Sequence, residues 1–368
     1  NVLVLDNAKK AGRKVLISGG GRCNFTNNNI DTNAFICNNP HFVKSALSRF
    51  TAWDFIELVE RHGVAFHERD HGQLFCDDSA KDIVDLLHTE CEWAGVQIQL
   101  RTEILSISKD VEGLFTLVTN QGEYRCQSLV IATGGLSMPK LGATPYGYKV
   151  AEQFGLNIVE TKAGLVPFTL HKEDKDKYAD LSGISLPARI TTASGVNFKE
   201  ALLFTHRGLS GPSVLQVSSY WNPGELISID LLPEDNILST LASLTESHPN
   251  QALKTALSQL LPKRLVAIFY QDELLPDCSL KQLDHKQLAE IETLLHNWQV
   301  KPNGTEGYRT AEVTLGGVDT DALSSKTMEA KSVAGLYFIG EVMDVSGWLG
   351  GYNFQWAWSS GWSAGQFV

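Results

Sequence analysis

The sequence has 368 residues, of which 43% are hydrophobic and 20% are charged. These proportions are typical of globular proteins, so they exclude collagen, disulfide scaffolds and disordered chains, and the length predicts two or three domains. The net charge of −11, from 31 Lys and Arg against 42 Asp and Glu, argues against a long nucleic acid as the default partner. It leaves room for a local basic patch.

Cysteine use and hydropathy bear on the cellular setting. The six cysteines are scattered and form no C-x-x-C pair, which predicts a reducing cytoplasm and no metal site. No apolar run reaches about 18 residues, so we expect no membrane-spanning helix. The sequence starts at Asn1 and enters an apolar run at once, without the basic start and cleavage site of a signal peptide.

Hydrophobic patterning predicts alternating strands and helices at both ends of the sequence, around a different middle. Residues 2–5 are apolar at every position, which is typical of a strand buried on both faces of a parallel sheet. Further strands are expected at 96–100, 114–118, 128–132 and 335–340, and helices at 42–62, 79–95, 146–154 and after residue 351. In the middle, short strands are expected at 166–170, 188–193, 201–204 and 226–231, as in a small barrel, followed by helices over 236–298 and a strand at 311–315. The pattern indicates one α/β domain interrupted by an insertion.

The run of residues 18–24 is a candidate ligand-binding turn. Three consecutive glycines allow backbone N–H groups to approach a phosphate or a flat ring, and Arg22 adds a positive charge. It is not a P-loop, because the Gly-x4-Gly-Lys spacing is absent. Asp6, at the end of the first strand, is placed where dinucleotide-binding folds hold ribose hydroxyls. The alternatives are a flexible loop for the glycines and a solvated acid for Asp6.

Two further turns follow buried strands. Thr133-Gly134-Gly135 ends the strand at 128–132, and its alternative is an ordinary strand-to-helix turn. Gly340-Glu341 and Asp344 follow the strand at 335–340, and Gly350-Gly351 opens the last helix. A helix N-terminus presents free N–H groups and about half a positive charge, which suits an electron-rich ring. Asp344 is a candidate for a ribityl hydroxyl, whereas Trp356, Trp358 and Trp362 are expected in the core, with partners for their N–H groups.

The middle segment holds two candidate substrate residues. His206 lies in Phe-Thr-His-Arg-Gly-Leu-Ser-Gly-Pro and can transfer a proton near neutral pH. Ser210, in the same motif, is a candidate N-cap for a following helix. Arg309 can pair with a substrate carboxylate or carbonyl. The alternatives are a structural histidine and a structural ion pair.

Four motifs, at residues 12–27, 132–137, 204–212 and 340–353, together resemble the YhiN/BaiN-type family of bacterial FAD-dependent oxidoreductases. This family is similar to aminoacetone oxidase and to the BaiN-type bile-acid reductases, and the resemblance covers essentially the whole sequence. It implies a Rossmann-like FAD-binding domain of the two-dinucleotide-binding type, interrupted by a β-barrel plus helical domain. The implied domains are residues 1–165 and 314–368 for FAD and residues 166–313 for the substrate.

The resemblance also implies roles for individual residues. Asp6 would hold the adenosine ribose, Ile104 would give backbone contacts near the adenine, and Thr133 and Gly134 would flank the dinucleotide. The pyrophosphate and ring would be lined by Lys14, Ser18, Gly19, Gly20, Gly21, Arg22, Cys23 and Asn24. The ribityl chain and the pyrimidine end of the ring would be bound from the last motif, which contains Gly340, Glu341, Asp344, Gly350, Gly351, Tyr352 and Asn353.

The sequence departs from the family at one point. The family's Gly-x-Gly-x-x-Gly unit lies about thirty residues before the position of Asp6, and it is absent here. We therefore expect that the sequence is an incomplete record, that the strand at 2–5 lacks its inner neighbour, and that the chain as written binds FAD weakly or not at all.

The predicted function is hydride transfer between an organic substrate and flavin N5, with His206 and Arg309 handling a small-molecule substrate. NAD(P)H is a candidate transient donor, although no second Gly-x-Gly-x-x-Gly is visible. The alternatives are a non-catalytic flavin- or nucleotide-binding module and a flavoprotein linked to RNA modification. The acidic balance and the lack of a Lys/Arg cluster argue against the last, so we expect neither nucleic acid nor membrane as a partner.

Overall fold

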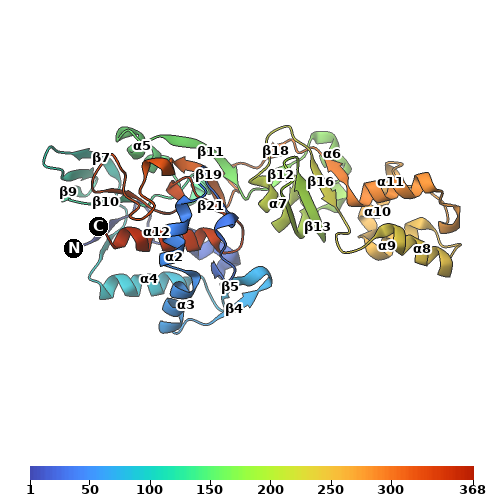
Figure 1. The fold of residues 1–368 in the computed structure, drawn as a ribbon, viewed down its shortest axis with the longest axis horizontal. Coiled ribbons are helices and arrows are strands. Elements are labelled where there is room, and N and C mark those ends of the chain that lie inside the picture. Colours follow the sequence, from blue (N-terminus) through green and yellow to red (C-terminus); the bar gives the residue numbers. More distant parts are fainter. The chain divides into compact units, whose positions relative to one another are not determined.

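The protein divides into two compact units in a computed structural model that describes residues 1–368 (Figure 1). Unit 1 consists of Asn1–Lys162 and Val313–Val368, and unit 2 of Ala163–Glu312. The sequence pattern places the interruption between residues 166 and 313. None of the helices is long and apolar enough to cross a membrane.

Two pairs of parallel strands form the α/β part of unit 1. β1 (Leu3–Leu5) pairs with β6 (Gln97–Gln99), and β10 (Leu129–Ile131) pairs with β20 (Leu336–Phe338). All three residues of β20 are buried, as expected for a strand with apolar residues at every position. The carboxyl ends of β10 and β20 therefore lie at the same edge, where loops of α/β folds bind ligands.

The strand at residues 2–5 differs from its prediction. Val2, Leu3 and Val4 are 55%, 36% and 41% exposed, so the expectation of a strand buried on both faces is wrong in this structure. The reason is that β1 pairs with β6 alone, and neighbouring strands and helices are what normally cover such a run.

Smaller antiparallel sheets and a further strand pair complete the β-structure of unit 1. One sheet has the order β7-β8-β9 and another the order β2-β5-β4, while β21 pairs with β3 and β11 with β19. Their bounds are β2 Asn24–Asn27, β3 Phe35–Ile36, β4 Phe66–Arg69, β5 Gln73–Cys76, β7 Ile104–Lys109, β8 Phe115–Thr119, β9 Gly122–Cys126, β11 Ile158–Gly164, β19 Val313–Val318 and β21 Ser346–Gly347.

The helices of unit 1 bury one face each. Thr51 caps α3 in a capping box with Asp54, which satisfies free N–H groups of the first turn. The predicted helix over 42–62 is thereby divided into two. The bounds are α1 Arg13–Ile17, α2 Phe42–Arg49, α3 Ala52–Arg61, α4 Lys81–Trp93, α5 Tyr146–Gln153 and α12 Tyr352–Gly365.

α12 carries the three tryptophans expected in the core. Trp356 is 1% exposed and its Nε1 donates to Gly340 O (3.2 Å), while Trp358 Nε1 donates to Phe25 O (2.9 Å). Trp362 is 37% exposed, so the prediction is wrong for this residue, which stacks on Phe50 instead. A helix of 14 residues packed on one side presents its remaining face to solvent.

Unit 2 contains one antiparallel sheet and a group of helices. The strands predicted as a small barrel form a seven-stranded sheet in the order β17-β16-β13-β14-β15-β12-β18, with β17 and β18 at its ends. The bounds are β12 Phe168–Thr169, β13 Ser185–Thr192, β14 Asn197–Phe204, β15 Gly208–Ser210, β16 Ile227–Asp230, β17 Trp298–Val300 and β18 Gly304–Thr305. The helices are α6 Lys172–Lys177, α7 Pro212–Ser218, α8 Ile237–Ser247, α9 Leu253–Leu260, α10 Lys263–Gln271 and α11 His285–His296.

A single apolar core joins the sheet and helices of unit 2, and Phe168, Phe204 and Phe269 are among its fully buried members. The prediction of Ser210 as the N-cap of α7 is wrong. Ser210 ends β15, and the N-cap is Gly211, which has a φ of 91° and no side chain to donate or accept a bond. Pro212 at the first helical position starts the helix instead.

Candidate functional site

The glycine run is packed on one side and open on the other. Gly19, Gly20 and Gly21 have φ values of 56°, 68° and 88°, the left-handed region that glycine adopts without strain. A Cβ on Gly19 would meet the Phe75 ring, whereas a Cβ on Gly20 or Gly21 would meet no atom within 4 Å. The run therefore forms a shallow cradle whose floor is backbone.

Two more glycines with left-handed backbone follow the parallel strands β10 and β20. Gly134 and Gly340 have φ values of 70° and 69°, and neither has an atom within 4 Å of where a Cβ would sit. Gly135 differs, because a Cβ there would collide with the Thr314 side chain. The open glycines lie at the carboxyl ends of neighbouring strands, which is where α/β folds place dinucleotides.

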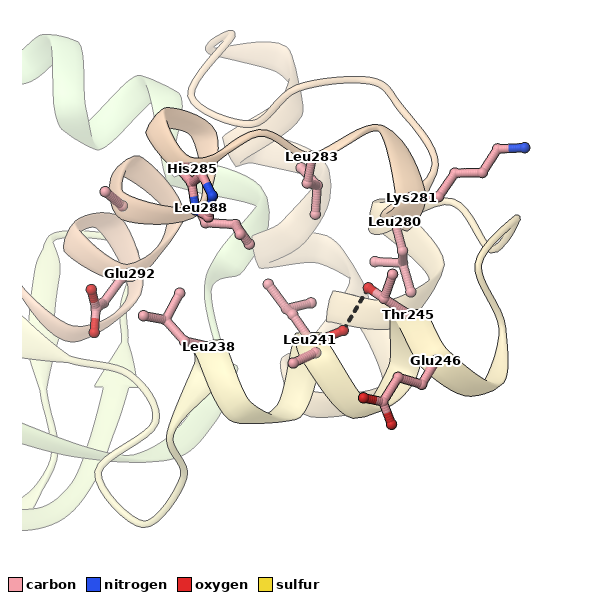
Figure 2. A pocket seen from close by; sticks show the side chains of 12 residues that line it. Leu238, Leu241, Thr245, Glu246, Leu280, Lys281, Leu283, His285, Leu288 and Glu292 are labelled. Carbon is pink, nitrogen blue, oxygen red and sulfur yellow. Dashed lines mark hydrogen bonds between the residues drawn. The ribbon is translucent and has the colours of Figure 1, made fainter.

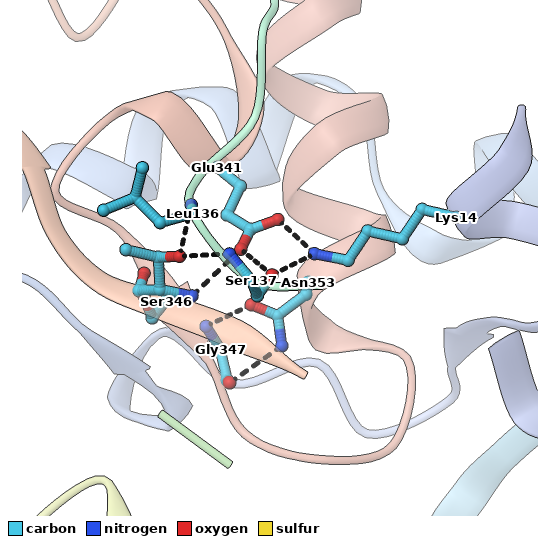
Figure 3. A network of polar contacts seen from close by, with 8 residues as sticks. Lys14, Leu136, Ser137, Glu341, Ser346, Gly347 and Asn353 are labelled. Atoms are coloured by element: carbon cyan, nitrogen blue, oxygen red, sulfur yellow. Dashed lines mark hydrogen bonds and ion pairs between the residues drawn. The ribbon is translucent and has the colours of Figure 1, made fainter. Parts of the chain in front are cut away.

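A polar network joins the three glycine-rich segments (Figure 3). Lys14 Nζ donates to Ser137 Oγ (2.7 Å) and to Glu341 Oε2 (2.6 Å), and Ser137 Oγ donates to Glu341 Oε1 (3.1 Å). Lys14 and Glu341 side chains are 40% and 19% exposed. Because the ion pair is only partly exposed and is joined by a hydroxyl, it holds α1, the turn after β10 and the turn after β20 in one arrangement.

Thr314 supports this network from β19, and sequence analysis did not identify it. Its N–H donates to Glu341 Oε1 (2.9 Å), and its Oγ1 accepts from the N–H groups of Leu136 (2.8 Å) and Ser137 (3.1 Å). Both Thr314 and Ser137 are buried. Their sequence context has no special signal, since their role depends on strands that meet only in the fold.

At the start of α12, the side chain of Asn353 holds the backbone of the preceding loop in place. Asn353 Oδ1 accepts from Gly347 N (2.8 Å), and its Nδ2 donates to Gly347 O (2.9 Å) and Trp348 O (3.2 Å). Gly351, the N-cap, has a φ of 95° and no side-chain cap, and it packs against Thr26 O. Asn353 therefore shapes the loop before the helix, and the first turn of α12 has no side-chain cap, so its N–H groups could bind an anion.

Other residues of the last motif have structural contacts. Gly350 packs against the Gln73 side chain, and Tyr352 is 8% exposed and donates from its hydroxyl to Asn29 O (3.0 Å). Asp344 is 4% exposed, and its Oδ2 accepts from Asn38 N (2.9 Å). Burial raises the pKa of the Asp344 carboxyl above its ordinary value, and the Asn38 hydrogen bond opposes that rise.

The predicted nucleotide residues near the start of the sequence lie on separate elements. Asp6 follows β1 and accepts from Ala8 N (2.8 Å), and Ile104 begins β7. Ser18 donates to Val15 O (2.7 Å) and Arg22 is exposed, while Asn24 begins β2. Their arrangement around a ligand stays a prediction.

Cys23 is not suited to nucleophilic chemistry. It is fully buried, and burial raises the pKa of its thiol to about 11. The neighbouring Cys76 is also fully buried, and burial raises its pKa to about 12. Because the thiolate is the reactive form, both cysteines act as core residues beneath the glycine run.

In unit 2, an ion pair ties together the segments of the two predicted substrate residues. Thr205 Oγ1 accepts from Arg207 N (3.2 Å) and Gly208 N (3.1 Å), which forms a tight turn with exposed His206 at its tip. Arg207 Nη1 lies 3.0 Å from Glu306 Oε2, and the Glu306 side chain is only 10% exposed. Exposed Arg309 follows Glu306 by three residues. β12 lies between β15 and β18 and is antiparallel to both, so the two loops flank β12, one beyond each of its ends.

A hollow of about 660 Å³ lies elsewhere in unit 2, between α8, α11 and residues 280–283 (Figure 2). Leucines such as Leu238, Leu241 and Leu280 line it, together with the charged residues Glu246 and Glu292. None of the residues predicted from the sequence contributes to this hollow, and its lining has no group suited to redox chemistry.

The residues of unit 1 fit an FAD dinucleotide. The glycines at 20, 21, 134 and 340 leave open space where side chains would otherwise stand, and those at 134 and 340 follow the carboxyl ends of the parallel strands β10 and β20. Lys14 adds a positive charge and α12 an uncapped N-terminus. No group of three or more His, Cys, Asp or Glu residues is arranged to hold a metal ion.

Comparison with known proteins extends these observations. A family model described as "HI0933-like protein Rossmann domain" matches residues 1–367. The chain is 61% identical over 365 residues to a protein named ribosomal RNA dihydrouridine synthase from Escherichia coli, covering 99% of this chain and 91% of that protein. It is 53% identical to a protein of the same name from Haemophilus influenzae, covering 98% and 90%.

A more distant relative has a different name. The chain is 26% identical over 385 residues to 3-dehydro-bile acid delta(4,6)-reductase from Clostridium scindens, covering 99% of this chain and 92% of that protein. The similarities extend over nearly the full length of all three relatives, so they apply to both units.

Proposed function

This chain belongs to the HI0933-like Rossmann-domain family, and from that premise we propose that it reduces uridine to dihydrouridine in ribosomal RNA, with FAD as its cofactor. The family confirms the class predicted from the motifs, an FAD-dependent oxidoreductase. The observation that carries the choice of substrate is the 61% identity, over 99% of the chain, to the relative named for this reaction. That reaction corresponds to the RNA-modification alternative of the sequence analysis.

The reaction adds a hydride and a proton across the C5–C6 double bond of uracil, and bound FAD, once reduced by a donor such as NADH or NADPH, would supply the hydride. The chain's own residues have three tasks. The open glycines and Lys14 would hold the cofactor, and the Ser137–Glu341–Thr314 contacts keep that arrangement rigid. Exposed His206 would deliver the proton, and Arg309 would bind a uracil carbonyl.

The acidic net charge is the main argument against an RNA substrate, and it led the sequence analysis to expect no nucleic-acid partner, an expectation that this proposal replaces. Net charge describes the sum of all groups, whereas RNA contacts only one face of a protein. A chain with a charge of −11 can therefore bind RNA where its cations gather.

The experiment supplies the purified protein with excess FAD, NADH or NADPH, and ribosomal RNA transcribed in vitro without modified nucleosides. We expect dihydrouridine in the nucleoside digest, detected by mass spectrometry as uridine that has gained two hydrogens. His206→Ala and Arg309→Ala, with flavin content unchanged, should lower the yield.

Three results would overturn the proposal. One is flavin-loaded protein that yields no dihydrouridine with either nicotinamide donor. Another is rapid NAD(P)H oxidation driven by enones while the RNA stays unmodified, which would point to a small organic substrate. The third is a flavin that no donor reduces, which would indicate a binding module.

A further inference from the structure

Five cationic side chains gather on unit 1 around the loop between β1 and α1. They are Lys9, Lys10, Arg13, Arg101 and Lys140, and we call them the basic surface. Arg13 is half-buried and the other four are exposed. They come from three stretches of the chain, so the sequence does not show them as a cluster.

Backbone contacts join the three stretches. Arg101 N donates to Ala8 O (3.0 Å), which places Arg101 beside the loop that carries Lys9 and Lys10. The Arg13 guanidinium donates to Leu141 O (3.0 Å) and Lys140 O (3.2 Å). These bonds hold Arg13 in place without neutralising its charge, because the acceptors are carbonyls.

No carboxylate forms an ion pair with a residue of the basic surface. No ion pair includes any of its five members, whereas ion pairs engage eight other lysines and arginines, namely Lys14, Arg61, Lys81, Arg125, Lys177, Lys199, Arg207 and Lys286. The same stretches contain two carboxylates, Asp6 and Glu103, which together offset at most two of the five positive charges.

Helix α4, which packs on α1, does not supply the missing negative charge. Val84 of α4 lies against Gly12. Asp85 is paired with Lys81, and Asp82, which accepts from Ser79 N (3.2 Å), offsets at most one positive charge. The basic surface therefore keeps an excess of positive charge, although the net charge of the whole protein is negative.

We infer that the basic surface binds the phosphodiester backbone of the RNA substrate, an inference that rests on the proposed function. Phosphate contacts by exposed Lys and Arg position RNA without reading its sequence. The family resemblance assigns Lys14 and residues 18–24 to the pyrophosphate and ring of the cofactor, and Asp6 and Ile104 to its adenosine, and none of these residues belongs to the basic surface. Five cations over three stretches exceed what one diphosphate requires.

The test measures the affinity of flavin-loaded protein for an rRNA transcript over a range of salt concentrations. The variant carries Lys9→Gln, Lys10→Gln and Lys140→Gln together. Each lost phosphate contact lowers the slope of log affinity against log salt by about 0.7 for single-stranded RNA, so we expect the slope to fall by about 2. The matched control carries Arg61→Gln, Lys81→Gln and Arg125→Gln, which removes the same charge from residues already paired with carboxylates.

The control variant should keep the wild-type slope, and both variants should keep their bound flavin. An unchanged slope in the first variant overturns the inference, as does an equal loss in the control, which would mean that only net charge matters. Loss of flavin in the first variant also overturns it, because the charges would then serve the cofactor. A shifted slope without any dihydrouridine synthesis by the wild type would sink the proposed function and leave the basic surface standing.

Discussion

Asp344 and Cys23 are the two ionisable side chains among the predicted cofactor residues that the fold removes most completely from water. Asp344 is 4% exposed and Cys23 is fully buried. Burial raises the pKa of both groups, since a charge loses its hydration when it is buried. Lys14 and Glu341, by contrast, stay partly exposed and paired. This pair is therefore an ionic contact of the candidate site that stays open to solvent.

The raised pKa of Asp344 predicts a pH-dependent stability. A carboxyl whose pKa is higher in the folded than in the unfolded state stabilises the fold below its ordinary pKa of about 3.9, and this contribution is lost as the pH rises through the folded value. We expect Asp344→Asn to raise the Tm of the flavin-free protein at pH 7. The gain should shrink as the pH falls toward 4. An Asn variant less stable at pH 7, in thermal melts followed by circular dichroism, would contradict this account.

At the scale of an element, the absence of side chains in the glycine run at residues 19–21 leaves open space in front of its backbone. Gly20 has a φ of 68° with open space before it, and Gly63, which follows α3, has the same φ of 68° and the same open surroundings. A Cβ at either position costs about 1–2 kcal/mol of backbone strain. Only at Gly20 would the Cβ also enter the cradle.

The two glycines therefore provide a matched pair of variants. We expect Gly20→Ala and Gly63→Ala to lose similar stability in urea denaturation, while only Gly20→Ala weakens FAD binding in a flavin fluorescence titration. Equal FAD affinity in the two variants would show that the run does not line the cofactor.

The ion pair between Arg207 and Glu306 predicts that the two partners differ in how strongly their substitution weakens RNA binding. Because Glu306 is the less exposed partner, Arg207→Ala leaves a carboxylate without its counter-charge, whereas Glu306→Gln leaves an exposed cation. We expect Arg207→Ala to raise the KM for RNA several-fold more than Glu306→Gln does, with kcat changed less than KM. The exchanged pair, Arg207→Glu with Glu306→Arg, should recover part of the loss. Equal kinetics in all variants would mean that the ion pair between the two loops does not contribute to RNA binding.

At the scale of the whole molecule, each unit has its own apolar core. The core of unit 2 lies entirely within residues 163–312, and Glu312 N donates to Leu165 O (3.1 Å) where the segment begins and ends. Neighbouring ends and a separate core are typical of an insertion that folds by itself.

We therefore expect residues 163–312, expressed alone, to fold and unfold in one cooperative thermal transition. Dispersed amide resonances in an NMR spectrum would confirm a packed core. A gradual melt with narrow amide dispersion would show that unit 2 depends on unit 1.

Much of the fold follows from local patterns. The apolar runs at 129–131 and 336–338 do form parallel strands, and the second is buried at all three positions, whereas Val130 in the first is 36% exposed. The family and the Rossmann-type fold, predicted from four motifs, are confirmed by the family model. The exposed face of β1 and the N-cap at Gly211 were mispredicted, because each depends on which neighbour an element receives.

The sequence by itself determined the glycine-rich turns, the strands that precede them and the family. Only the tertiary structure decided which side chains meet there. Lys14 and Glu341 are 327 residues apart, Thr314 carries no local signal, and the basic surface draws on three separate stretches. The physical reason is that backbone preferences and hydrophobic periodicity act between near neighbours in the chain, whereas ion pairs and side-chain hydrogen bonds depend on the order in which the strands assemble.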